Sequence, residues 1–139
     1  MQRMVDWLLA NPYTGSLAYI SVAVLALLVF LYVFEIAARY RCWDEIRKGN
    51  LAAAMATGGK IFGICNIFRF SVEGGDSVYQ SMIWASFGFV VLLAAYFLFE
   101  FLTPVFRIDE EIKRDNRAVG LIAMLISVSL SYVIGATVL

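Results

Sequence analysis

The chain has 139 residues, 62% of them hydrophobic, with a mean hydropathy of +0.80 and no net charge at pH 7. A soluble domain usually has about 45–50% apolar residues, so the excess is predicted to face a lipid bilayer. The chain has no histidine, which excludes Ser-His-Asp triads and most catalytic zinc sites. The balanced charge provides no basic surface for a nucleic acid.

Four apolar stretches are long enough to cross a membrane as helices. About 20 apolar residues span the ~30 Å hydrocarbon core, and we expect spans at residues 16–38, 51–72, 78–103 and 118–139. Residues 1–15 are predicted to form an interfacial stub in which Asn11-Pro12 ends a turn. Residues 73–77 are predicted to form a turn on the outer side of the membrane, and Pro104 is predicted to break the third span.

A charged motif follows the first span and occurs again after the third. Residues 44–54 read DEIRKGNLAAA and residues 110–120 read EEIKRDNRAVG, 66 positions later. Each copy lies between two apolar stretches, so the chain reads as one helical hairpin written twice, at 16–72 and 78–139. The sequence therefore predicts an all-α integral membrane protein whose four transmembrane helices form two tandem hairpins of the same direction.

Basic residues predict the orientation of these hairpins. Positively charged residues are enriched in short cytoplasmic loops. The two motif loops contain eight of them, and the other side has two, Arg3 and Arg69. The eight are Arg39, Arg41, Arg47, Lys48, Arg107, Lys113, Arg114 and Arg117. We therefore expect cytoplasmic motif loops, both termini outside, and a pseudo-axis along the membrane normal.

The motif itself has two interpretations. Asn50 and Asn116 each precede a helix and are suited to cap it, while Glu45 and Glu111 pair with neighbouring bases or with the other hairpin. In this interpretation the motif, including Ile46 and Ile112, only shapes a connector. Alternatively, both copies form a cytoplasmic gate or a ring of ligand-binding groups.

Three charged residues are predicted to lie inside spans. They are Glu35, Lys60 and Glu100, and such charges normally pair or face water. Lys60 lies near the middle of its span, so we expect it to contact Glu35 or Glu100 within one subunit or across two. The contact is either a buried ion pair that fixes packing or a polar element of a permeation or proton path. The glutamates could instead pair with Arg39 or Arg107.

Small and polar residues form a stripe on the second and fourth spans. Such faces allow helix backbones to approach closely, which predicts association with a second copy or with another membrane protein. The stripe contains Gly59, Gly63, Asn66, Ser127, Ser131 and Gly135. Cys42 and Cys65 imply no disulfide, and the sequence has no metal-ligand cluster, cofactor motif or nucleophile paired with a base, so no enzymatic activity is expected.

The doubled motif, EIRKGNLAAA and EIKRDNRAVG, with an acid near the end of each preceding span, resembles the bacterial domain-of-unknown-function 350 family. The resemblance extends from about residue 16 to the end of the chain. It implies a small four-span protein of the bacterial plasma (inner) membrane with an internal repeat, and it implies no reaction.

Two functions remain open from the sequence. The first is an oligomeric conduit or sensor for a small cation or proton, with Glu35, Lys60 and Glu100 as its polar elements. The second is a non-catalytic accessory or scaffold subunit that docks a cytoplasmic enzyme, a membrane partner or anionic lipid through its charged loops.

Overall fold

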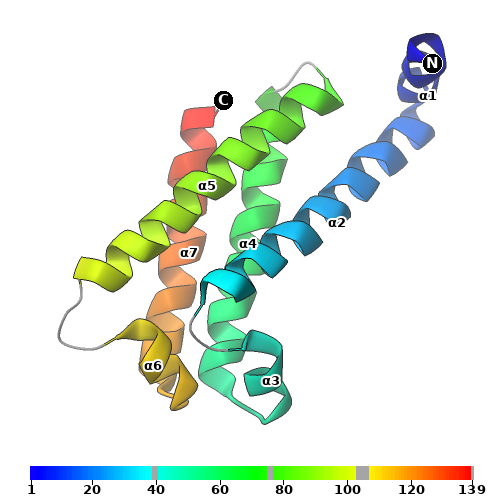
Figure 1. Cartoon of the computed structure of the whole chain (residues 1–139). Coiled ribbons are helices and arrows are strands. Elements are labelled where there is room, and N and C mark those ends of the chain that lie inside the picture. The colour runs from blue at the N-terminus through cyan, green and yellow to red at the C-terminus, as the bar shows by residue number, and fades with distance from the viewer. Residues whose placement is uncertain (39–40, 75–76, 103–106, 139) are drawn as a thin grey trace.

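The computed structural model describes residues 1–38, 41–74, 77–102 and 107–138, and the described residues form helices and short connections without strands. The helices are α1 (Gln2–Ala10), α2 (Pro12–Ala37), α3 (Cys42–Arg47), α4 (Leu51–Gly74), α5 (Val78–Leu102), α6 (Ile108–Lys113) and α7 (Arg117–Val138) (Figure 1). The helices α2, α4, α5 and α7 are long and apolar enough to cross a membrane, which confirms the four predicted spans. Arg39, Pro104 and part of the predicted outer turn lie outside the described residues.

The first span begins earlier than predicted. Asn11 is the N-cap of α2, its side-chain oxygen accepting a hydrogen bond from the Tyr13 N–H (3.1 Å), and Pro12 occupies the first turn. Proline is well tolerated there, because the first helical N–H groups lack partners within the helix. Asn11-Pro12 therefore begins a span instead of ending a stub, and only residues 2–10 form the separate helix α1.

The motif copies contain two short helices that the sequence analysis treated as loops. α3 and α6 have acidic residues in the first turn and a basic residue, Arg47 or Lys113, in the last. This distribution favours a helix, because it opposes the charge of the helix dipole at both ends. Each short helix turns directly into the next span.

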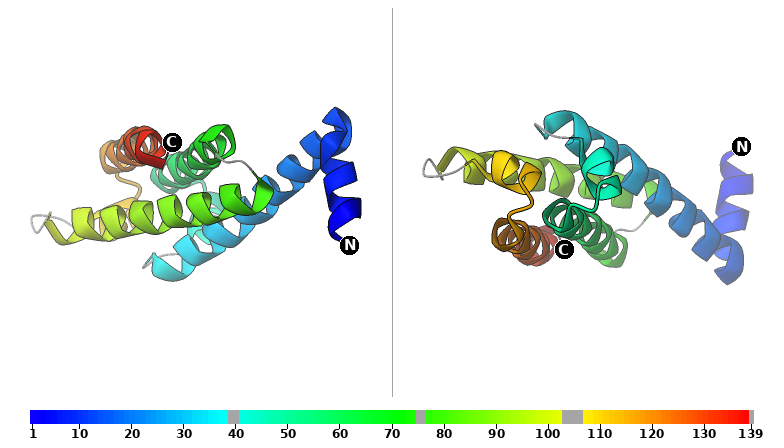
Figure 2. Two further views of the ribbon diagram at one scale, coloured as in Figure 1. Left: turned by 90° about the horizontal axis from the view of Figure 1, so that it is seen from above. Right: turned by 90° about the horizontal axis from the view of Figure 1, so that it is seen from below.

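The four long helices form a bundle in which α4 and α7 lie side by side and run parallel (Figures 1 and 2). Helix α5 crosses both of them, whereas α2 contacts α4 near its own C-terminal end and leans away toward α1. The short helices α3 and α6 lie at the end where α4 and α7 begin, and the two termini lie toward the other end (Figure 1). Both motif copies are thus at one end of the bundle.

Glycines set the spacing between α4 and α7. A Cβ on Gly59 would lie 2.6 Å from the Met124 Cα, and a Cβ on Gly120 would lie 2.6 Å from the Ala52 Cα. Neither distance is tolerated, so the helices approach this closely only with glycine at both points. Gly63 lies against Ser127, and Gly135 against the ring of Phe70.

The small-residue faces of α4 and α7 therefore pack against each other within one chain. Asn66 Nδ2 donates a hydrogen bond to Ser131 Oγ across this contact (3.0 Å). The sequence analysis assigned these faces to association with a second copy or another membrane protein. That assignment needs correction, because the faces are already buried, and any assembly must use another surface.

A cluster of apolar side chains joins all four long helices at the centre of the bundle. It consists of Phe34, Ile64, Ile67, Phe89, Leu92, Tyr96 and Ile134. Many large apolar side chains on α2, α5 and α7 are exposed on the outside of the bundle. That surface suits lipid, which is as apolar as the side chains themselves.

Two neighbouring glycines allow a matched test of the α4–α7 contact. A Cβ on Gly58 meets no atom within 4 Å. We expect Gly59→Ala to lower the free energy of unfolding by about 1–3 kcal/mol through overpacking. Gly58→Ala should raise it by up to about 1 kcal/mol through helix propensity. Denaturant unfolding in detergent micelles measures both, and equal stabilities would contradict the packing described.

Candidate functional site

Lys60 is a lysine buried inside the bundle. It lies on α4 with 2% of its surface exposed. Its Nζ lies 4.7 Å from the ring centroid of Tyr96 on α5 and 5.0 Å from that of Phe34 on α2. Both rings present favourable cation–π geometry, so Lys60 is surrounded by aromatic side chains from two other spans.

Asp109 is the acid that the structure associates with Lys60. It lies on α6, is 4% exposed, and accepts a hydrogen bond from the Tyr96 hydroxyl. Tyr96, whose ring lies beside the Lys60 ammonium, thus connects Lys60 to Asp109. Lys60, Tyr96 and Asp109, together called the Lys60 cluster below, therefore join α4, α5 and α6.

The sequence analysis missed Asp109 and Tyr96, and it named Glu35 and Glu100 as partners of Lys60. A contact of Lys60 with either glutamate stays a prediction. The signal that could have identified Asp109 comes from aligning the two halves of the chain on their motif copies. In that alignment Asp109 corresponds to Trp43, and Lys60 corresponds to Ile126. Both members of the charged pair are therefore apolar in the other half.

Glu35 lies instead in a charged cleft at the motif end of the bundle. The cleft has a volume of about 440 Å³, and Glu35 itself is half-buried. Carboxylates and cations both line it, from α2, α3, α6 and the connections beside them. The lining consists of Glu35, Ala38, Arg41, Asp44, Glu45, Lys48 and Lys113. Glu100 lies near the end of α5 and is half-buried.

In each motif copy, one helix ends and the next helix begins directly after it. In the first copy the Gly49 N–H donates to the Ile46 carbonyl (2.9 Å) and the Asn50 N–H donates to the Glu45 carbonyl (3.0 Å). This is a Schellman ending, which requires a positive φ at its turn residue, and Gly49 has φ +88°. Asn50 then caps α4, its Oδ1 accepting from the Ala53 N–H (2.9 Å).

The second copy makes the same local bonds. The Asp115 N–H donates to Ile112 (3.0 Å) and the Asn116 N–H to Glu111 (2.9 Å). Asn116 Oδ1 accepts from the Val119 N–H (3.4 Å), so the capping interpretation is confirmed for both asparagines. In each copy the asparagine Nδ2 also donates to the motif glutamate, Glu45 (3.2 Å) or Glu111 (3.0 Å).

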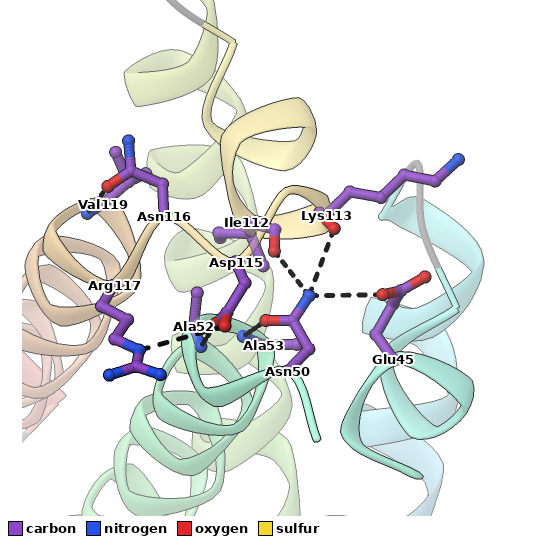
Figure 3. Close-up of polar contacts among 10 residues, drawn as sticks. All are labelled: Glu45, Asn50, Ala52, Ala53, Ile112, Lys113, Asp115, Asn116, Arg117 and Val119. Carbon is purple, nitrogen blue, oxygen red and sulfur yellow. Dashed lines mark hydrogen bonds and ion pairs between the residues drawn. The ribbon is translucent and has the colours of Figure 1, made fainter. Parts of the chain in front are cut away.

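The two copies also bond to each other, and these bonds are not reciprocal (Figure 3). Asn50 Nδ2 donates to the carbonyl oxygens of Ile112 (2.7 Å) and Lys113 (3.3 Å) at the end of α6. Asp115, at φ +58°, accepts from the Ala52 N–H at the start of α4 (3.0 Å). Aspartate tolerates this left-handed conformation better than most residues. Hydrogen bonds thus join the end of α6 to the beginning of α4.

These groups suggest ion pairing and proton exchange more than metal binding. Among the residues that the structure describes, no group of three or more Cys, Asp or Glu side chains is arranged to hold a metal ion. Cys42 is buried and Cys65 is exposed, and both are free thiols. The groups able to exchange a proton inside the bundle include those of the Lys60 cluster, whose three members are buried.

Comparison with known proteins gives a family without a stated reaction. The family model described as "Domain of Unknown Function (DUF350)" matches residues 7–138. The UPF0719 transmembrane protein YshE of Bacillus subtilis (strain 168) is 58% identical over 126 residues, which cover 91% of this chain and 94% of that protein. No solved structure matches the chain.

The asymmetry of the two asparagines is testable by substitution. Asn50→Ala removes the cap of α4 and leaves the Ile112 carbonyl without its donor, so we expect a loss of about 2–3 kcal/mol of unfolding free energy. Asn116→Ala removes a cap and the bond to Glu111, but no bond to the other motif copy, and should lose about 1 kcal/mol. Asn50→Asp keeps the capping oxygen and should fall between them. Denaturant unfolding in micelles ranks the three, and equal losses at both asparagines would refute the cross-bond.

A double-mutant cycle tests the attraction between Lys60 and Asp109. Lys60→Met and Asp109→Asn should each destabilise the protein by about 1–3 kcal/mol, because each removes a buried polar group from the Lys60 cluster. The double variant should lose at least about 1 kcal/mol less than the sum of the two. Additive losses in unfolding experiments would mean that the two groups do not interact.

Proposed function

This chain belongs to the Domain of Unknown Function 350 family and is a multi-pass membrane protein, and we propose that it is a conduit or sensor for protons. We base this proposal on the buried polar groups of the chain itself. The observation that carries the proposal is a set of buried polar side chains on α4 and on the helices around it. On α4 itself and at its N-cap these are Asn50, Thr57, Lys60, Asn66 and Ser71, and from neighbouring helices Asp109, Ser81, Ser127 and Ser131.

These side chains occur at intervals along most of α4, from Asn50 to Ser71, on more than one of its faces. Thr57 precedes Lys60 by one turn, and its buried hydroxyl makes no hydrogen bond with the described part of the chain. Beyond Lys60 follow the bonded pair Asn66–Ser131 and then Ser81, whose hydroxyl donates to the Ser71 carbonyl (3.2 Å). Hydroxyl and amide groups in series, with water between them, can pass protons.

The free-energy cost of placing charged residues inside a membrane supports a functional role for the Lys60 cluster. A lysine or an aspartate at the centre of a membrane helix costs about 2.5–3.5 kcal/mol on insertion scales. Replacing a buried ion pair with apolar residues of similar volume is often neutral or stabilising. The corresponding positions in the other half of the chain hold apolar residues, Ile126 and Trp43, so the repeat itself does not require a charged pair there.

The chemistry favours a proton over a metal cation. A lysine ammonium repels cations that pass beside it, whereas Lys60 can give up a proton and the Asp109 carboxylate, which accepts a hydrogen bond from the Tyr96 hydroxyl, can take one up. Glu35, in the charged cleft at the same end of the bundle, is placed to deliver or accept protons at the entrance.

The topology belongs to the same proposal. We infer two tandem hairpins of one direction, with the motif loops cytoplasmic, both termini outside, and a bacterial plasma (inner) membrane location. In support, α2, α3 and α4 begin at Pro12, Cys42 and Leu51, and α5, α6 and α7 begin at Val78, Ile108 and Arg117. Each helix of the second series begins one motif interval after its counterpart in the first. The excess of basic residues lies in the motif loops.

The alternative is an accessory or scaffold subunit. The charged cleft favours it, because three carboxylates and three cations surround an open volume next to α3 and α6. A cytoplasmic enzyme could dock there through complementary charges, and the buried charges would then serve only the fold.

Proton flux into liposomes distinguishes these functions. Under a potassium diffusion potential, with a pH dye inside, we expect the wild-type protein to carry protons. Asp109→Asn should lower the flux about a hundredfold, because a positioned proton-transfer group contributes about 10²–10⁴, and Lys60→Met should also lower it. Asp6→Asn, which changes an exposed acid on α1 outside the charged cleft, is the matched control.

The Glu35→Gln/Glu100→Gln double variant tests whether these acids belong to the path. Flux that survives both Asp109→Asn and Lys60→Met would refute the proposal. Absence of flux from folded protein, verified by circular dichroism in the same liposomes, would refute it as well and favour the accessory subunit.

A further inference from the structure

The contact between α4 and α7 is not reciprocal. When the two halves are aligned on their motif copies, the α4 residues that meet α7 correspond to α7 residues that are all exposed: Ala118, Leu125, Ser129, Tyr132 and Ala136. The α7 residues that meet α4 correspond to α4 residues that are exposed or half-buried: Ala54, Gly58, Ile61, Cys65 and Arg69. Each helix therefore uses a different face, and one face of each stays uncovered.

We propose that a second copy of this chain covers this surface by seating its α3 and α4 on the outer face of α7. The first half of the second copy would lie on the second half of the first copy, as the two halves of one chain lie on each other. A contact that joins two different faces is heterologous, and it continues from copy to copy until the rotation closes a ring. The inference concerns assembly and does not depend on the proton path.

A groove on α7 supports this occupant. It has a volume of about 300 Å³ and an apolar lining of Phe99, Ile108, Asn116, Ala118, Val119, Ile122, Ala123 and Ile126. The corresponding residues on α4 include Ala52, Ala53 and Ala56, which are fully buried in one cluster with Ile112 of α6. Ile112 corresponds to Ile46, so Ile46 of a second copy fits the groove on α7.

Two residues at the proposed interface differ together from their counterparts in the other half of the chain, since both are apolar where the counterparts are charged. Within the chain, Tyr96 connects Asp109 on α6 to Lys60 on α4. Between copies the corresponding pair is Trp43 on α3 and Ile126 on α7. Trp43 is 51% exposed in the single chain, and Ile126 lines the groove. An apolar pair thus stands where the chain has a charged pair, as an interface facing the same membrane depth requires.

The hydrogen bonds at the motif end of the contact between the two halves also have a counterpart between copies. Asn50 Nδ2 donates to the carbonyl oxygens at the end of α6. Asn116 lines the groove and is half-buried. The same geometry places its Nδ2 next to the Ile46 and Arg47 carbonyls at the end of α3 in the second copy.

The glycine positions allow the same helix packing between copies, except that the helices lie slightly farther apart at one point. Within the chain Gly59 meets Met124, and between copies the corresponding pair is Leu125 and Gly58, so one glycine remains at the crossing. Gly58 has open space around it in the single chain. Ala54 and Ala118 correspond to Gly120 and Ala52, and there the helices of two copies lie slightly farther apart.

A native cysteine allows a direct test. A Cβ on Gly63 would lie 3.6 Å from the Ser131 Cβ, and the corresponding pair between copies is Ser129 and Cys65. Disulfides join Cβ atoms about 3.5–4.5 Å apart. We therefore expect Ser129→Cys, oxidised in native membranes, to form a disulfide with Cys65 of the next copy and to give a ladder of linked species on a non-reducing gel.

Two controls define the result. The ladder should disappear when Cys65→Ser is added. It should not form with Val90→Cys, a 60% exposed residue at a similar depth on α5. Linked species that end at the dimer, or equal linking through Val90→Cys, would overturn the proposal.

Mass photometry in mild detergent provides a second measurement. Trp43→Ala should raise the dissociation constant of the oligomer about thirtyfold, the effect of removing an interface hot spot. Trp7→Ala, on α1 outside the proposed contact, should leave it unchanged. A monomer in native membranes with no linked species would overturn the proposal and mean that lipid chains fill the groove.

Discussion

The close contact of α4 with α7 determines where every other group lies. Gly59 and Gly120 bring the two helix backbones together at points where any side chain would collide. This contact positions the starts of both helices, and therefore both motif copies, at one end of the bundle. It also places α5 across the two helices, so that Tyr96 reaches Lys60. Without it, the buried polar side chains along α4 would face lipid.

Lys60 shows how a membrane protein can hold a charge where water is scarce. The ammonium lies over two aromatic rings, and one of them, Tyr96, donates a hydrogen bond to Asp109 on a different helix. None of these three groups belongs to the span that carries the lysine. The charge is therefore stabilised only when α2, α4, α5 and α6 are all in place, which links the integrity of the cluster to the fold of the whole chain.

Much of the fold could be predicted from the sequence, because lipid imposes a simple requirement of length and apolarity. The four spans and the caps at Asn50 and Asn116 followed from local patterns. The start of α2 did not, since Asn11-Pro12 signals either a turn or a helix N-terminus. The short helices α3 and α6 were missed for a similar reason, because short stretches of charged and mixed residues also suit a loop.

The site was harder to predict than the fold. Lys60 is conspicuous inside an apolar span, but its partner is one of three consecutive acids, and local sequence does not show that Asp109 points inward while Glu110 remains largely exposed. The faces of small residues on the second and fourth spans were predicted, but it was not predicted that these faces pack against each other. The sequence of a packing face does not show which helix covers it. Three-dimensional contact supplied both answers.

The burial of α4 has a consequence for how the protein is made. Of the four spans it is the least apolar and the most buried, and the residues that shelter Lys60 and Asn66 on α5, α6 and α7 are synthesised after it. A newly made α4 therefore enters the membrane before most of the covering of its polar side chains has been synthesised, since only α2 precedes it among the helices around Lys60. The insertion machinery, or water near it, must hold this segment until the last helix emerges, so the 22 residues of α7 complete the insertion of a span translated long before them.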